Sequence, residues 1–203
     1  MSFYERVILP RVVDRVIGTR AVAQERQEAL REVSGRVLEI GFGSGLNLPH
    51  YSEAVTHLVA IDPTDTGARL AKDRIAAAPF PVEFAPLAGE ALPYTEGEFD
   101  AVVSTFTLCT IAGVEQALQE ARRVLRPGGR LYFLEHGRAA DPAVQQLQVR
   151  LRGFWAFIGG GCQLDRDVPA LVEGAGFRLG PLERYESEGP RFASGRFRGW
   201  AEK

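Results

Sequence analysis

The chain has little cysteine and no long apolar run. Its 203 residues include only two cysteines, Cys109 and Cys162, which form neither a CxxC pair nor a zinc-finger spacing. No stretch approaches the roughly 20 apolar residues that a membrane span needs. Charged residues such as Glu5 and Arg6 interrupt the N-terminus, so we expect no signal peptide. These absences exclude disulfide-rich and membrane-spanning proteins and favour a location in a reducing cytoplasm.

The chain also lacks a dominant charge. It carries 24 Lys and Arg residues against 26 Asp and Glu residues, a formal net charge of -2. No whole-molecule field therefore attracts nucleic acid, and no basic stripe with interleaved aromatics is present. The length fits a single domain, which we predict to consist of a helical cap over residues 1–33 and a core over residues 34–203.

From residue 36 onward, short apolar segments alternate with amphipathic ones. Such alternation predicts a parallel sheet covered by helices on both faces. The last third of the chain predicts further helices and two closing strands that form an antiparallel hairpin at one end of the sheet. The expected strands cover residues 36–40, 57–61, 82–85, 99–105, 130–135, 177–185 and 192–201, and the expected helices 46–51, 66–78, 114–125, 142–157 and about 167–175.

Two further helices are expected before the first strand, over residues 3–17 and 21–33. In the first of them, Val12 and Val16 belong to an apolar stripe at helical spacing. This helix has several open roles: packing on the sheet, covering a pocket, meeting a partner or making peripheral contact with a membrane.

A glycine-rich turn follows the first strand and opens the next segment. Gly41, Gly43 and Gly45 stand at alternate positions after an apolar run that ends in Glu39 and Ile40. Glycine lets the backbone bend and approach a ligand closely, because no Cβ is in the way. The turn therefore predicts a site for a nucleoside-type cofactor.

The residues around this turn bear on the choice of cofactor. In a dinucleotide motif, GxGxxG, the third glycine would stand where this chain has Leu46. Glu39 suits a cofactor with ammonium and sulfonium groups, since opposite charges attract. Asp62, after the second strand, could hold ribose hydroxyls of either cofactor class. Two alternatives stay open: an NAD-dependent oxidoreductase, and a non-catalytic cofactor-binding domain.

The glycine turn, Asp62, the Ala88-Gly89-Glu90 segment and the Pro127-Gly128-Gly129 turn occur in one order. Together they resemble the class I S-adenosylmethionine-dependent methyltransferases over about residues 34–135. The resemblance implies an α/β, Rossmann-like, doubly wound sheet of seven strands, six parallel and one antiparallel. Many members carry an aspartate where this chain has Ala88.

The same resemblance implies roles for individual residues. It places the three glycines and Glu39 around the methionine part of the cofactor, and Asp62 on the ribose. Thr105 would lie near the methionine amine and the methyl group. The adenine would lie against Pro63, Gly89 and Glu90.

Features near the fourth and fifth strands bear on the methyl acceptor. The segment after strand four, residues 104–110, lacks the Asn/Asp-Pro-Pro-Tyr/Phe element that holds planar amino nitrogens, which speaks against adenine or glutamine as acceptor. His136 follows strand five, and an imidazole titrates near pH 6.5, so it could take a proton from a thiol or hydroxyl. The alternative is a polar pocket wall. Cys109 is expected to be a small buried residue, and Cys162 an exposed one.

An apolar cluster, Phe154 to Ile158, precedes Cys162 and is expected either in the core or as one wall of an apolar substrate pocket. A narrower resemblance rests on Glu39–Asn47, Leu108-Cys109, Glu135-His136 and Gly161–Arg166. These segments look like the methyltransferase-like thiol S-methyltransferases of animals, from about Glu25 to the C-terminus. With the absence of nucleic-acid features, the motif set predicts a methyltransferase that acts on a small, partly apolar acceptor, a thiol or hydroxyl compound.

The animal proteins carry an apolar membrane anchor where this chain has a charged amphipathic helix.

Overall fold

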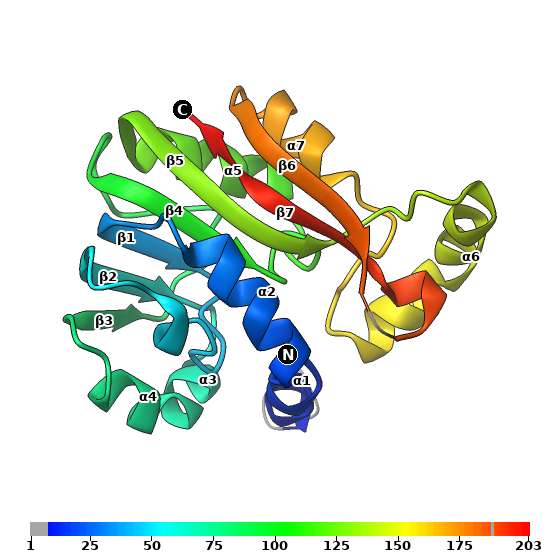
Figure 1. Ribbon diagram of the computed structural model, residues 1–203, viewed down its shortest axis with the longest axis horizontal. Coiled ribbons are helices and arrows are strands. Elements are labelled where there is room, and N and C mark those ends of the chain that lie inside the picture. Colours follow the sequence, from blue (N-terminus) through cyan, green and yellow to red (C-terminus); the bar gives the residue numbers. More distant parts are fainter. Residues whose placement is uncertain (1–7, 188) are drawn as a thin grey trace.

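The computed structural model describes residues 8–187 and 189–203, which build a seven-stranded sheet in the order β3-β2-β1-β4-β5-β7-β6 (Figure 1). β7 runs antiparallel to its neighbours β5 and β6, and the other neighbouring pairs are parallel. This arrangement confirms the expected fold and the closing hairpin. The strands are β1 Gly35–Ile40, β2 Val55–Ile61, β3 Val82–Ala85, β4 Phe99–Thr105, β5 Leu125–His136, β6 Arg178–Glu186 and β7 Gly195–Glu202.

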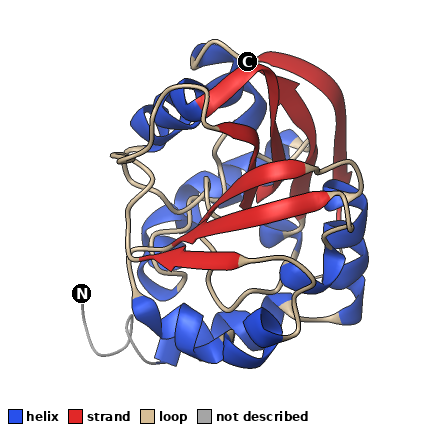
Figure 2. Ribbon diagram, turned by 90° about the vertical axis from the view of Figure 1, so that its left-hand side faces the viewer, coloured by secondary structure: helices blue, strands red, loops and turns tan. Residues whose placement is uncertain are grey.

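Helices cover both faces of the twisted sheet (Figure 2). On one face, Leu38 and Ile40 of β1 pack in a core with α5 (Val114–Val124) and α7 (Val168–Gly174). On the other face, Val37 packs with Leu30, the last residue of α2 (Arg20–Leu30). Successive residues of a strand point to opposite faces, so a strand buried on both sides is apolar over most of its length.

Several expected elements have other bounds in the structure. The strand expected over residues 130–135 is longer, Leu125–His136, and the helix expected over 21–33 ends at Leu30. Residues 46–51 form only a short 3₁₀ turn, Leu48–His50, because the chain becomes extended at Tyr51. The helix expected over residues 66–78 is divided at the buried Ala71 into α3 (Asp65–Leu70) and α4 (Lys72–Ala76). The last strand begins at Gly195 rather than Phe192, since a 3₁₀ turn, Arg191–Ala193, precedes it.

α1 (Leu9–Ile17) buries none of its residues against the part of the chain that the structure describes. The expectation that this helix packs on the sheet is therefore wrong. Its apolar stripe is exposed instead, at Ile8, Val12, Val13 and Val16. Residues 3–7 of the expected first helix lie outside the described residues.

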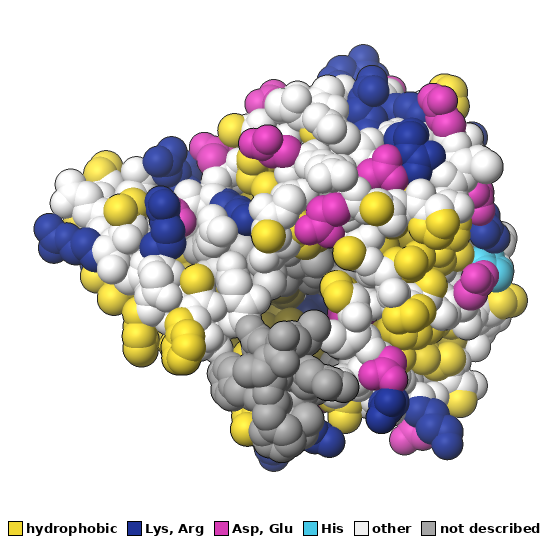
Figure 3. Space-filling model, turned by 180° about the vertical axis from the view of Figure 1, so that it is seen from behind, with side chains coloured by type: hydrophobic (Ala, Val, Ile, Leu, Met, Phe, Trp, Pro, Cys, Tyr) yellow, Lys and Arg dark blue, Asp and Glu magenta, His cyan; other side chains and the backbone are white. Residues whose placement is uncertain are grey.

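α6 (Pro142–Ile158) projects from the body of the molecule (Figure 1). Apolar side chains gather on this projecting arm in Figure 3, and those of Phe154 and Phe157 are 65% and 82% exposed. Core packing is thus wrong for these two residues, although Trp155 packs against Phe192. Among the described residues, no helix has the length and apolar character needed to cross a membrane.

Candidate functional site

The glycine turn adopts a backbone that only glycine takes easily. Gly41, Gly43 and Gly45 have φ values of 77°, 52° and 73°. A Cβ on Gly41 would lie 2.1 Å from Oγ1 of Thr107, so the turn is packed against the loop after β4. Beside Gly43, by contrast, no heavy atom of the described residues lies within 4 Å of a Cβ position. The turn therefore leaves open space at its middle glycine.

Asp62 lies directly after β2 and is bound to the same turn. Its carboxylate accepts hydrogen bonds from the backbone N–H of Gly43 at 3.1 Å and from the N–H and hydroxyl of Thr64 at 3.0 and 3.2 Å. Burial raises the pKa of Asp62, and these hydrogen bonds counteract that rise. Pro63, the next residue, is exposed. The structure thus brings Asp62 and Gly43 together.

A buried polar network joins the ends of β1 and β4. Glu39 accepts hydrogen bonds from Nδ2 of Asn47 at 2.9 Å and from the hydroxyl of Tyr51 at 2.8 Å. Asn47 also donates to Oγ1 of Thr105 at 3.0 Å. Burial raises the pKa of Glu39 to about 7, against the effect of these donors. Two residues singled out in the sequence, Glu39 and Thr105, therefore share one network.

Arg26 completes this network and was missed by the sequence reasoning. Its Nη1 donates to Asn47 Oδ1 at 2.7 Å and to Thr105 Oγ1 at 2.8 Å. The side chain is only 3% exposed, and burial lowers its pKa to about 10. Its Nε finds no hydrogen-bond partner in the described parts of the chain. A sequence signal existed, because Arg26 occupies the buried stripe of α2 with Val22 and Leu30.

Gly89 and Glu90 occupy different surroundings. Gly89 is buried against β1, where a Cβ would lie 3.0 Å from Cγ2 of Ile40. Glu90 turns toward α5, and its Oε1 accepts a hydrogen bond from the N–H of Gly113 at 3.4 Å. The structure thus does not join Glu90 to the network of Glu39.

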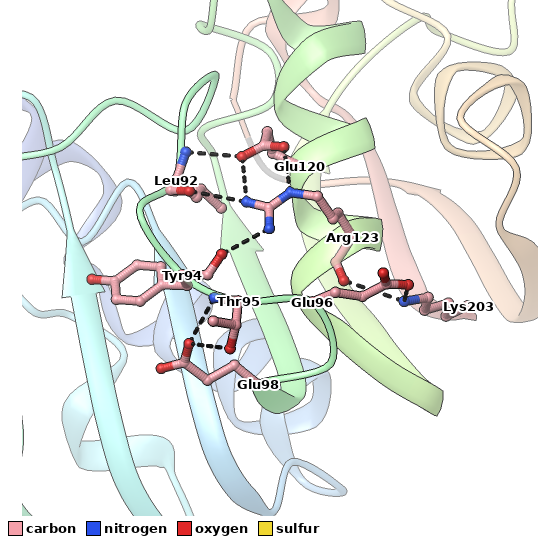
Figure 4. Close-up of polar contacts among 8 residues, drawn as sticks. All are labelled: Leu92, Tyr94, Thr95, Glu96, Glu98, Glu120, Arg123 and Lys203. Atoms are coloured by element: carbon pink, nitrogen blue, oxygen red, sulfur yellow. Dashed lines mark hydrogen bonds and ion pairs between the residues drawn. The ribbon is translucent and has the colours of Figure 1, made fainter.

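The segment after Glu90 is fastened to α5 by one arginine (Figure 4). Arg123 donates to the carbonyl oxygens of Leu92 at 2.9 Å and Tyr94 at 2.7 Å. Glu120 accepts from the same guanidinium at 2.7 and 2.8 Å and from the N–H of Leu92 at 2.9 Å. These contacts fix the path of the chain on the side where adenine is expected.

The loop after β4 is held by the carboxylate of Glu135. This fully buried group accepts hydrogen bonds from the hydroxyl of Ser104 at 2.8 Å and from the N–H groups of Thr107 at 3.0 Å, Leu108 at 3.0 Å and Cys109 at 3.3 Å. Within the loop, Phe106 has a φ of 55°, which a non-glycine residue adopts only when its surroundings enforce it.

His136 ends β5 and lies beside both cysteines. Its ring centroid is 5.0 Å from that of Phe106. Burial lowers the pKa of His136, so the imidazole is neutral at pH 7 and can accept a proton. Cys109 is buried as expected, but Cys162 is only 7% exposed, which corrects the expectation of an exposed thiol. The N–H of Gln163 donates to the carbonyl of Cys109 at 2.8 Å and draws this segment inward.

Known proteins are similar to this chain in fold and in sequence. A family model described as a methyltransferase domain matches residues 38–133. The human thiol S-methyltransferase TMT1A is 32% identical over 185 residues, covering 85% of this chain and 75% of that protein. Human TMT1B is 35% identical over 179 residues, covering 77% of this chain. A putative methyltransferase from Bacillus halodurans has the same fold, with a TM-score of 0.70 at 17% identity over 89% of this chain and 95% of that one.

The sheet order is that of the Rossmann-like methyltransferases, and the matching domain model is a methyltransferase model rather than an oxidoreductase model. Within that class, the chain belongs to the family that includes the thiol S-methyltransferases of animals. The match spans about two thirds of the TMT1B proteins, 66% of the human and 65% of the mouse sequence.

Proposed function

We propose that this protein transfers a methyl group from S-adenosylmethionine to the sulfur of a small, partly apolar thiol. The observation that carries the proposal is the placement of two groups at one edge of the sheet. The Glu39 network and the glycine turn lie at the carboxyl ends of β1 and β4, and His136 lies at the carboxyl end of β5. Open α/β sheets bind their ligands at this edge. The names of the similar human proteins support a thiol as acceptor.

The residues present fit the cofactor. The open space at Gly43 admits a ligand, and the carboxyl group of Glu39 complements the ammonium and sulfonium charges. The unpaired Nε of Arg26 is available for the methionine carboxylate. We assign Asp62 to the ribose hydroxyls. The remaining assignments are Gly41 and Gly45 to the methionine pocket, Thr105 to the amine and methyl group, and Pro63, Gly89 and Glu90 to the adenine.

The cofactor supplies an electrophilic methyl group on a sulfonium. For the acceptor, we assign the proton of the thiol to a ring nitrogen of His136. Bound S-adenosylmethionine would give its methyl group to the acceptor sulfur, with S-adenosylhomocysteine as the leaving group that takes the electron pair of the broken bond. A positioned base of this kind contributes on the order of 100- to 10,000-fold in rate.

A panel of alkyl thiols, phenols and amines tests the acceptor, with release of S-adenosylhomocysteine as the measurement. We expect turnover with alkyl thiols. His136→Ala should lower the turnover number by about 100-fold while the cofactor Kd changes less than about twofold. His57→Ala is the matched control, because that imidazole lies on β2 and pairs with Glu83. Turnover of phenols but of no thiol would show that the acceptor assignment is wrong.

Cofactor affinity should depend on pH through Glu39. With a pKa of about 7, this carboxyl group is mostly neutral at pH 6 and mostly ionised at pH 8. Because the ionised form attracts the cationic cofactor, affinity should follow the ionised fraction and rise by up to about tenfold in total from pH 6 to pH 8. Calorimetry at several pH values measures the effect, and Glu39→Gln should flatten the profile. An equal pH dependence in that variant would assign it to another group.

We propose that residues 1–33 act as a cap on the core and that α1 covers part of the site. Oδ1 of Asp14 accepts hydrogen bonds from the hydroxyl of Ser44 at 2.5 Å and from Nη1 of Arg74 at 3.1 Å, which ties α1 to the glycine turn. The exposed apolar stripe of α1 suits peripheral contact with a membrane surface. A reducing cytoplasm, which keeps the two free thiols reduced, is our proposed location.

A further inference from the structure

Two thiols and an imidazole meet beside the acceptor end of the sheet. Cys109 comes from the loop after β4, His136 from the end of β5, and Cys162 from the segment after α6. One ligand atom of each residue lies within 4.8 Å of the others, and the two sulfur atoms are 3.6 Å apart. We propose that these three side chains bind a zinc ion and leave its fourth coordination position open.

The distances suit tetrahedral zinc. Two thiolates bound to zinc at about 2.3 Å stand about 3.8 Å apart, and a nitrogen bound at about 2.0 Å stands about 3.5 Å from each sulfur. The observed sulfur–sulfur distance of 3.6 Å already lies close to the first value. The imidazole nitrogen lies within 4.8 Å of both sulfur atoms and would have to move closer to them to complete the three-ligand set.

Hydrogen bonds hold the three ligands in place. The N–H of Cys109 donates to Glu135 at 3.3 Å, and its carbonyl accepts from Gln163 at 2.8 Å. The N–H of Cys162 donates to the carbonyl of Gly159 at 3.3 Å. His136 is paired with Arg196 across β5 and β7. Because the two cysteine segments are bonded to each other and to β5, little ordering is left for the metal to impose.

Zinc binds cysteine as the thiolate and histidine as the neutral imidazole, so metal binding would release the protons of both thiols.

A buried donor lies next to the cluster. The indole N–H of Trp155 is buried and has no hydrogen-bond partner among the described residues. A Cβ on Gly159 would lie 3.3 Å from this indole nitrogen and 3.4 Å from Cβ of Cys162. Donors of this kind orient and stabilise metal-bound sulfur.

Three protein ligands with an open position are typical of catalytic zinc. The open position would take the acceptor thiol, a step that rests on the proposed function. Zinc deprotonates a coordinated thiol, so the proton leaves to solvent and the acceptor is held as a thiolate. In the metal-bound protein, His136 is then a ligand, and the metal replaces it in removing the proton.

Metal analysis and cobalt substitution of the full chain test the site. We expect one zinc ion per chain and, with Co²⁺, a thiolate-to-cobalt charge-transfer band. Loss of a ligand in Cys109→Ser, Cys162→Ser or His136→Gln should lower metal affinity by about 100-fold or more. Mutating a residue that only hydrogen-bonds to a metal ligand already lowers affinity by about 10- to 100-fold. His57→Gln should bind metal normally. Substoichiometric zinc in the wild type, or an unchanged band in both serine variants, would overturn the proposal.

Thiol alkylation, read by mass spectrometry, gives a test that needs no variant. Zinc should protect Cys109 and Cys162 together, whereas equal labelling with and without zinc would contradict the site. An alkyl thiol added to the cobalt-loaded protein should then shift the charge-transfer band. An unshifted band would show that the acceptor thiol does not bind the metal, and the metal would then have a structural role only. A shifted band without methyl transfer would refute the proposed function and leave the zinc site standing.

Discussion

Gly43→Val should abolish measurable cofactor binding, raising the Kd for S-adenosylhomocysteine by about 100-fold or more, equivalent to about 2.7 kcal/mol. A valine would place its side chain in the open space beside the turn, where we expect the cofactor. It would also have to adopt a φ of 52°, which costs a residue with a Cβ roughly 1–2 kcal/mol. Isothermal titration calorimetry measures the affinity, and circular dichroism should show little loss of secondary structure.

Gly128→Val separates these two effects. Gly128 has a φ of 72°, and a Cβ there would also meet no heavy atom of the described chain within 4 Å. It lies near the start of β5, whereas the site lies at the other end of the strand. This variant should lose similar stability and bind the cofactor normally. Near-normal affinity in Gly43→Val would place the ligand elsewhere.

Glu135→Ala should lower the free energy of unfolding by about 3 kcal/mol or more. The substitution leaves the hydroxyl of Ser104 and the N–H groups of Thr107, Leu108 and Cys109 without their shared acceptor. Each unsatisfied buried donor costs about 1–3 kcal/mol, partly offset because the buried carboxylate no longer has to be desolvated. Urea denaturation, with its midpoint and slope, measures the change.

Two variants bracket this result. Ser104→Ala removes one donor and leaves the three backbone hydrogen bonds to Glu135, so it should cost about 1 kcal/mol. Glu135→Gln keeps one acceptor oxygen, and its loss in the free energy of unfolding should lie between those of Glu135→Ala and Ser104→Ala. If Glu135→Ala cost no more than Ser104→Ala, the carboxylate would not be the group that holds the loop.

The sequence predicted those parts of the molecule that follow from local pattern. Apolar strands and the glycine turn placed Gly43 and Asp62 together, because the carboxyl ends of neighbouring parallel strands meet at one edge. Arg26 escaped this reasoning because its partners, Asn47 and Thr105, lie 21 and 79 residues away. The burial of Cys162 depends on a backbone hydrogen bond to the Cys109 segment, which no local pattern reveals.

The predicted boundaries of one helix were wrong for a related reason. Residues 66–78 have a helical pattern, but packing divides them at Ala71. Gly67 of α3 lies so close to the glycine turn that a Cβ there would be 2.1 Å from the carbonyl oxygen of Gly43. Contact with the cofactor turn, rather than helix propensity, therefore sets the position of α3.

The hydrogen bond from the N–H of Cys109 to Glu135 means that two of the three candidate zinc ligands are held by β5 and the third is not. Glu135 and His136 are consecutive residues of β5, so one strand end positions both the imidazole and the first thiol. Cys162 arrives on a separate segment that follows the projecting α6. Movement of that arm would withdraw one ligand and leave the other two in place. The rate of metal exchange should therefore follow the opening of the α6 segment rather than the stability of the sheet.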